Sequence, residues 1–178
     1  IGHGTHALGS AGGNGRATGA GLAAGTYAGM APSADLIAVR GSRSFISGVS
    51  DSEVVNGLSF INQKAAELGR PWVAHLSLGG HAGSHDGTSL IEQAIDNLVG
   101  PGKPGKAIVV SAGNEGDEAI HAAGQVPSGG TKQLSFFMPQ ARAGSMAVAA
   151  FDLWYKGSDR FGVGFRDPGG AGPCLPGS

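Results

Sequence analysis

The chain has 178 residues and a formal net charge of −1 at pH 7. Its lysines and arginines are scattered singly, which argues against a nucleic-acid partner and against a basic amphipathic helix on a membrane surface. The 34 glycines show no three-residue period and occur in a chain that is 40% hydrophobic, so collagen and disorder both fit poorly. Composition therefore favours a turn-rich globular enzyme.

The cysteine content and the start of the chain bear on disulfides, metal clusters and membrane segments. Cys174 is the single cysteine, which excludes a disulfide framework and a cysteine metal cluster and predicts an inert thiol. The sequence starts at Ile1, shows no signal-peptide pattern and has no apolar run long enough to span a bilayer. We therefore expect that the native N-terminus is absent and that no segment spans a membrane.

Helical and strand-like patterns alternate over the first two thirds of the chain. The elements expected in chain order are helices over 3–12, 51–69 and 88–100 and strands over 34–39, 72–78 and 106–111. Asp51-Ser52-Glu53 can cap the second helix, and Thr88 or Ser89 the third. Such alternation predicts right-handed crossovers and an α/β architecture, a parallel sheet covered by helices.

The opening stretch, Gly2-His3-Gly4-Thr5-His6, places a histidine between two glycines at the start of the first helix. Histidine is the commonest general base, and the glycines leave the ring of His3 approachable. A metal site is the weaker interpretation, because the stretch lacks the glutamate of a His-Glu-x-x-His zinc site. An incidental, structural His-x-x-His remains the alternative.

A second stretch, residues 107–116, has the pattern of a buried strand that runs into small residues and a side-chain amide. An asparagine at the end of a core strand can donate its NH2 group to an oxyanion that develops during a reaction. Asn114 is therefore a candidate oxyanion donor.

Four motifs together resemble, in order and approximate spacing, the subtilisin-like serine proteases, the subtilase family. They are Gly-His-Gly-Thr-His at 2–6, Ala-Pro-Ser-Ala-Asp-Leu at 31–36, Leu-Ser-Leu-Gly-Gly at 76–80 and Ser-Ala-Gly-Asn-Glu-Gly at 111–116. The resemblance covers residues 1 to about 120. It implies a subtilisin-like parallel sheet flanked by helices, hydrolysis of peptide or protein substrates through an Asp/His/Ser triad, and an extracellular or cell-envelope location. It implies no cofactor; structural calcium is compatible with the family, but this sequence does not locate a site.

Family roles carry over residue by residue. His3 matches the triad base and Asn114 the oxyanion donor, while His6 matches the family's second histidine, a structural residue. Residues 77–79 resemble the cleft strand that pairs with a peptide backbone, and residues 111–113 line the pocket for the residue before the cleaved bond. The implied substrate-binding residues are Ser77, Leu78, Gly79, Ser111, Ala112 and Gly113.

Chain order in this family is Asp, then His, then Ser. Because His3 lies at the start of the chain, we expect the triad Asp before Ile1. We do not assign Asp35 or Asp51 as the triad Asp. No Gly-Thr-Ser-small-x-Pro pattern follows the Asn114 motif, so we expect the Ser beyond residue 178. The fragment alone is therefore predicted to be inactive.

One stretch imitates the missing nucleophile. Gly87-Thr88-Ser89 precedes the asparagine motif and leads into an amphipathic helix, so it is interpreted as a helix start. The nearby His81, His85 and Asp86 are interpreted as solvated loop side chains.

After residue 120 the pattern changes to strand-like runs at 133–138, 145–155 and 159–166. This part resembles an inserted antiparallel β module, of sandwich or jelly-roll type, as in Csp-type subtilases of spore-forming bacteria. Trp154, Tyr155 and Phe161 are expected to pack in its core. The expected division is a partial catalytic domain over 1–120 and a partial inserted β module over 121–178.

The leading hypothesis is a fragment of a serine endopeptidase. The alternative is a non-catalytic interaction protein that retains the subtilase fold. An NAD- or phosphate-binding protein is disfavoured, because no Gly-x-Gly-x-x-Gly follows a strand and opens a helix.

Overall fold

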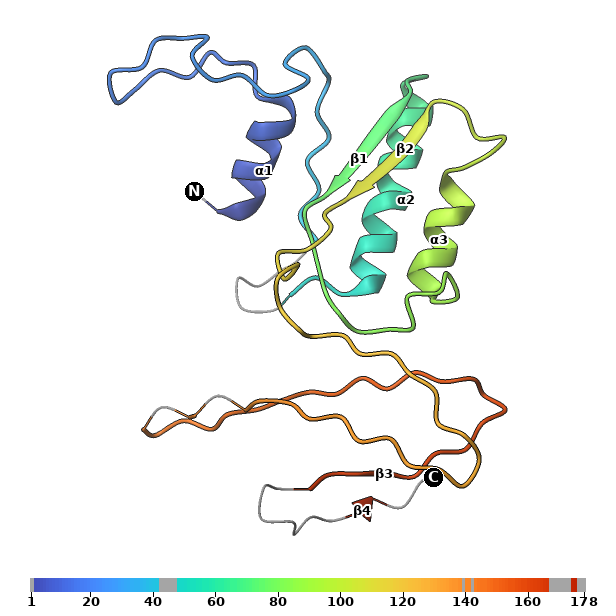
Figure 1. Cartoon of the computed structure of the whole chain (residues 1–178). Coiled ribbons are helices and arrows are strands. Elements are labelled where there is room, and N and C mark those ends of the chain that lie inside the picture. The colour runs from blue at the N-terminus through green and yellow to red at the C-terminus, as the bar shows by residue number, and fades with distance from the viewer. Residues whose placement is uncertain (1, 42–47, 139, 142, 167–173, 176–178) are drawn as a thin grey trace. The chain divides into compact units, whose positions relative to one another are not determined.

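The computed structural model describes residues 2–41, 48–138, 140–141, 143–166 and 174–175. The chain divides into two compact units, Ile1–Ala123 and Gly124–Ser178. Elements of the first unit are α1 (His3–Gly12), α2 (Asp51–Glu67), β1 (Trp72–Leu76), α3 (Leu90–Leu98) and β2 (Lys106–Val110) (Figure 1). The expected division into a partial catalytic domain over 1–120 and a partial β module over 121–178 stays a prediction.

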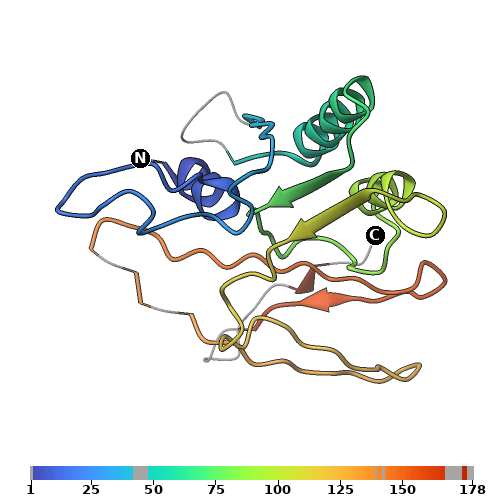
Figure 2. The same ribbon diagram turned by 90° about the horizontal axis from the view of Figure 1, so that it is seen from above.

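The first unit is built on a parallel pair of strands. β1 and β2 run in register from Trp72 opposite Lys106 to Leu76 opposite Val110. Both α2 and α3 lie on one side of this pair (Figures 1 and 2). The predicted helix–strand–helix–strand order over residues 51–110 is therefore confirmed as an α/β arrangement, with each element a little shorter than expected.

The core of this unit lies between the helices and one face of the sheet. Leu58 and Ala65 of α2 and Trp72 and Ala74 of β1 are buried there. Alternation along β1 points Val73 to the opposite face, where it is 68% exposed. The partly buried residues around this core are Val54, Ile61, Leu76, Ile95, Leu98, Val99 and Ile108.

The two helices that pack on the sheet, α2 and α3, begin with the same capping arrangement. Ser50 has extended backbone, its hydroxyl accepts a hydrogen bond from the Glu53 amide, and the Glu53 carboxylate accepts one from the Ser50 amide. The predicted cap at residues 51–53 was thus wrong by one residue. Of the two predicted caps of α3, Thr88 and Ser89, it is Ser89 that caps the helix in the same way, through Glu92.

The strand expected over 34–39 does not form, and that prediction was wrong. The segment follows a turn in which the Ala34 amide donates to the carbonyl of Ala31. A strand requires a neighbour to receive its backbone hydrogen bonds, and no described residue pairs with 34–39. Its apolar pattern therefore produces extended but irregular chain.

Backbone contacts fix the end of α1. The amides of Met30 and Ala31 donate to the carbonyls of Ser10 and Ala11, which lie in the last turn of the helix. Gly29 allows this approach, because a Cβ built on it would lie 2.5 Å from a backbone nitrogen of the helix end. The segment 29–31 thus holds the helix that begins at His3.

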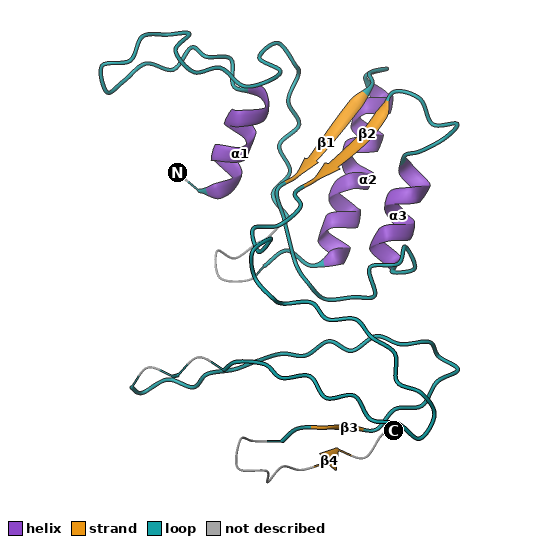
Figure 3. Cartoon of the chain, viewed as in Figure 1, coloured by secondary structure: helices purple, strands orange, loops and turns teal. Residues whose placement is uncertain are grey.

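The second unit contains little regular structure in its described residues. β3 (Val163–Gly164) pairs antiparallel with β4 (Cys174–Leu175), and the runs 133–138 and 145–155 carry no strand where they are described (Figure 3). Aromatic rings pack edge-on between Phe136 and Phe151 and between Tyr155 and Phe161. Tyr155 and Trp154 are nevertheless 47% and 59% exposed, so the prediction that they pack in a core was wrong. Alternating apolar residues alone do not create a ladder, and the sandwich or jelly-roll module stays a prediction.

Leu58 tests the core, because it is 1% exposed and touches both layers. Leu58→Ala should lower the free energy of unfolding by about 2–5 kcal/mol, since it removes buried methyl groups and leaves a cavity. Phe60→Ala on the same helix, at a side chain 46% exposed, should cost less than about 1 kcal/mol. Urea denaturation followed by circular dichroism measures both; equal losses would contradict this core.

Ser89 tests the interpretation of Gly87-Thr88-Ser89 as a helix start. Ser89→Ala should lower the free energy of unfolding by about 1 kcal/mol, because the amide of Glu92 loses its acceptor. Ser89→Thr keeps a hydroxyl at the cap and should retain most of the stability. Unfolding curves that do not distinguish the two variants would refute the capping role.

Candidate active site

The structure brings His3 to the carboxyl end of β1. Nε2 of His3 lies 3.0 Å from the carbonyl oxygen of Ser77 and 3.1 Å from its hydroxyl oxygen. Since a carbonyl oxygen can only accept, Nε2 carries the proton in the first of these contacts. The two residues are 74 positions apart in sequence, so the fold, and not local sequence, joins them.

The segments that follow the two strands remain joined beyond the sheet. The amide of Ser111 donates to the carbonyl of Leu76 over 3.0 Å, and its hydroxyl donates to the carbonyl of Leu78 over 2.7 Å. Because β1 and β2 are parallel, the expected substrate-binding segments 77–79 and 111–113 leave the same end of the sheet.

Asn114 follows the second of these segments and is exposed. Gly113, just before it, has φ of +90°, a turn that a glycine makes without strain. The Asn114 backbone amide donates to Oε2 of Glu115 over 2.9 Å. Within the described residues, the Asn114 carboxamide makes no hydrogen bond, and none joins Asn114 to His3.

Sequence reasoning missed Glu115 and His81 as members of this region. Oε2 of Glu115 lies 3.3 Å from Nε2 of His81, which follows the segment after β1. The pKa of Glu115 lies below its ordinary value, chiefly because the carboxylate accepts from the Asn114 amide, with a smaller contribution from His81. The carboxylate directly after the asparagine was the only signal in the sequence.

The loop between β1 and α3 uses its own polar groups. Asp86 accepts from the hydroxyls of Ser84 and Thr88 over 2.7 and 2.6 Å, and the hydrogen bond from Thr88 is the largest cause that holds the Asp86 pKa below its ordinary value. His85 contacts the carbonyl of His81. The Ser89 hydroxyl donates to Glu92 over 2.6 Å, so no described contact links it to either histidine.

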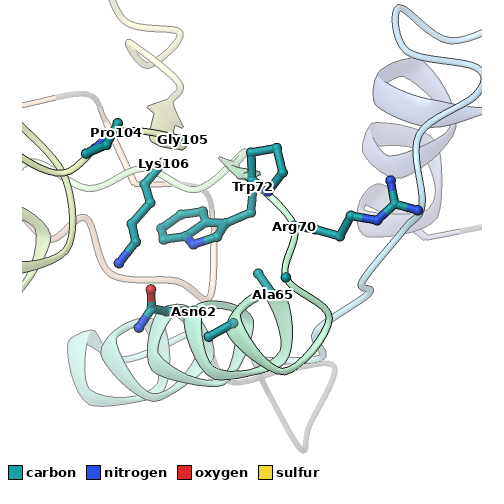
Figure 4. A pocket seen from close by; sticks show the side chains of 10 residues that line it. Asn62, Ala65, Arg70, Trp72, Pro104, Gly105 and Lys106 are labelled. Carbon is teal, nitrogen blue, oxygen red and sulfur yellow. The ribbon is translucent and has the colours of Figure 1, made fainter.

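A pocket of about 210 Å³ opens at the other end of the strands (Figure 4). It lies where β1 and β2 begin, beside the second half of α2, and contains none of the predicted site residues. Nε1 of Trp72 and Oδ1 of Asn62 are buried there without a hydrogen-bond partner.

The described residues contain no group of three or more histidine, cysteine, aspartate or glutamate side chains placed to hold a metal ion. No helix among them is both long enough and apolar enough to cross a bilayer.

Comparison with known proteins identifies the family. A sequence model described as the Subtilase family matches residues 1–160, beyond the point near residue 120 where the motifs end. No curated protein and no solved structure matches the chain. Because the match spans far more than half of its length, the chain belongs to the subtilase family of serine peptidases.

Proposed function

We propose that this chain is part of a subtilisin-like serine endopeptidase in which His3 is the general base and Asn114 the oxyanion donor. The contact between His3 and Ser77 is the observation that supports it most. It places the imidazole at the end of the sheet from which residues 77–79 and 111–114 also emerge. Sites of α/β proteins gather at this end of a parallel sheet.

In this mechanism a serine hydroxyl attacks the carbonyl carbon of the scissile peptide bond. His3 takes the hydroxyl proton at Nε2 and then gives it to the leaving amine. The carbonyl oxygen becomes an oxyanion in the tetrahedral intermediate, and the Asn114 NH2 group donates to it. By the order of motifs in this family, the triad Asp precedes His3 and the Ser follows the described asparagine motif.

The Ser77 contact bears on the state of the base. With a proton on Nε2, His3 cannot accept one from a nucleophile at that nitrogen. A carboxylate that accepts from Nδ1–H holds the opposite tautomer and leaves a lone pair on Nε2. The triad Asp is therefore required to orient the His3 ring and to set its tautomer. When no carboxylate accepts from Nδ1, Ser77 is the hydrogen-bond partner of the ring.

Substrate would bind along the two segments that leave the sheet. A peptide backbone can add beside residues 77–79 by main-chain hydrogen bonds. The surface at Gly79 is open, because a Cβ built there meets no atom within 4 Å. Residues 111–113 line the pocket for the residue before the cleaved bond, and the family supports secretion or an envelope location.

A non-catalytic interaction protein with the same fold is the second candidate. It is favoured by the Ser89 hydroxyl, the serine that imitates a nucleophile motif, which is engaged by Glu92 in a helix cap. The coding sequence on either side of this chain separates the two candidates, since only the peptidase supplies an Asp-x-Gly strand end and a Gly-Thr-Ser nucleophile turn.

An active-site-directed fluorophosphonate tests the peptidase. The 178-residue chain should remain unlabelled, because the serine hydroxyl beside His3 is that of Ser77, which lies before the Asn114 motif and not in a Gly-Thr-Ser nucleophile turn. A chain extended to include the flanking coding sequence should gain one label per molecule. His3→Ala should abolish that label, and intact mass measures all three. Labelling of the short chain at Ser89 would contradict both the triad assignment and the helix cap.

Asn114→Ala in the extended enzyme tests the oxyanion role. Turnover should fall about 10²–10³-fold, the cost known for this amide in subtilisin. KM should change little, because the amide acts on charge that develops in the transition state. Asn97→Ala, at an exposed asparagine of α3, is the matched control and should leave both constants unchanged. A change confined to KM would remove Asn114 from this role.

A further inference from the structure

A single carboxylate oxygen joins the two segments that leave the sheet. Oε2 of Glu115 accepts from the Asn114 backbone amide over 2.9 Å and lies 3.3 Å from Nε2 of His81. His81 belongs to the segment after β1, and Glu115 to the segment after β2. The hydrogen bond from Ser111 to Leu78 joins the same two segments closer to the strands.

The turn at Gly113 is shaped to receive this carboxylate. Its φ is +90°, and a Cβ built on Gly113 would lie 3.2 Å from Oε2 of Glu115. The carboxylate therefore folds back over the turn that delivers Asn114. A larger residue at 113 would be strained by its backbone and would crowd the carboxylate.

The exposure of the His81 and Glu115 side chains limits what their contact contributes to stability. The side chains of His81 and Glu115 are 60% and 37% exposed. Ion pairs this accessible to water add little to global stability, so the pair does not hold the fold together. Its effect is local, because the Asn114 amide that it engages sets the peptide plane from which the Asn114 side chain projects.

We propose that Glu115 and His81 are positioning residues that fix the Asn114 carboxamide for oxyanion binding. Glu115 holds the Asn114 peptide group, and His81 holds the Glu115 carboxylate from the opposite segment. The identification of Asn114 as the oxyanion donor rests on the proposed function; the contacts themselves do not.

The ionisation of Glu115 provides a readout that needs no catalysis. Its folded pKa lies below the ordinary value of 4.5, so the bonded carboxylate persists above that value and the contact is lost as pH falls through the lowered pKa. Other titratable groups occur on both segments and at the start of α3, namely His85, Asp86, Glu92, Asp117 and Glu118.

Nuclear magnetic resonance of the 178-residue chain tests the contacts. The Asn114 amide signal should titrate with a midpoint below 4.5, and Glu115→Gln should abolish that titration. His81→Ala should move the midpoint upward, because the imidazole no longer favours the ionised carboxylate. Glu118→Gln, a neighbouring carboxylate that does not contact Asn114, is the matched control. An Asn114 amide that does not sense Glu115 would overturn the proposal.

Nuclear magnetic relaxation of the Asn114 side-chain NH2 group tests whether the pair holds the carboxamide in place or only contacts the backbone. Its order parameter should fall in Glu115→Ala and in His81→Ala, and Glu115→Gln should restore most of it, because glutamine keeps an oxygen for the Asn114 amide. An unchanged order parameter in the alanine variants would show that the pair does not position the carboxamide. That result would leave the peptidase proposal standing, since turnover of Asn114→Ala judges it separately.

Discussion

The in-register parallel pairing of β1 with β2 is the constraint on which the rest of the first unit depends. Pairing Leu76 with Val110 makes the chain leave both strands at the same level, so Ser77 and Ser111 emerge side by side. A shift of one residue would turn every side chain of one strand to the other face. It would expose Trp72 and Ala74 and would also separate the two segments that carry the proposed substrate contacts.

The pairing is supported from one side only. α2 and α3 bury Leu58, Ala65, Trp72 and Ala74 against one face, whereas Val73 and Val109 on the strands are 68% and 53% exposed. Parallel sheets are usually covered on both faces. Within the described residues the core is therefore small. At the candidate site, the segments that follow the two strands are joined by the hydrogen bonds from Ser111 to Leu76 and Leu78.

Local rules predicted those parts of the fold that depend on neighbours in sequence. Ser89 caps α3 together with Glu92, and a serine followed three residues later by a glutamate can be recognised in the sequence itself. Residues 34–39 have a strand pattern, but a strand depends on a remote partner that sequence spacing does not supply. The same reason applies to residues 133–138 and 145–155, whose apolar residues alternate without a described ladder.

The candidate site divides in the same way. His3 and Asn114 could be singled out because their types and settings match a known chemistry. His81 could not, because its partner Glu115 is 34 positions away in the printed sequence and the two meet only when the strands are paired. The contact between Nε2 of His3 and Ser77 likewise depends on the tertiary fold, since nothing in the local sequence pattern indicates Ser77 as its partner.

The backbone closure at the end of α1 has a consequence for how this protein can be altered. The Gly29 amide donates to the carbonyl of Gly13, and the Gly25 amide to that of Gly15, so main-chain hydrogen bonds close the loop at its base. The side chains of Asn14 and Thr26 add one hydrogen bond each, to the Arg16 amide and the Ala23 carbonyl. Side chains at 16–24 take no part in these hydrogen bonds. This loop can therefore accept insertions, tags or a reporter sequence while the helix that carries His3 keeps its place.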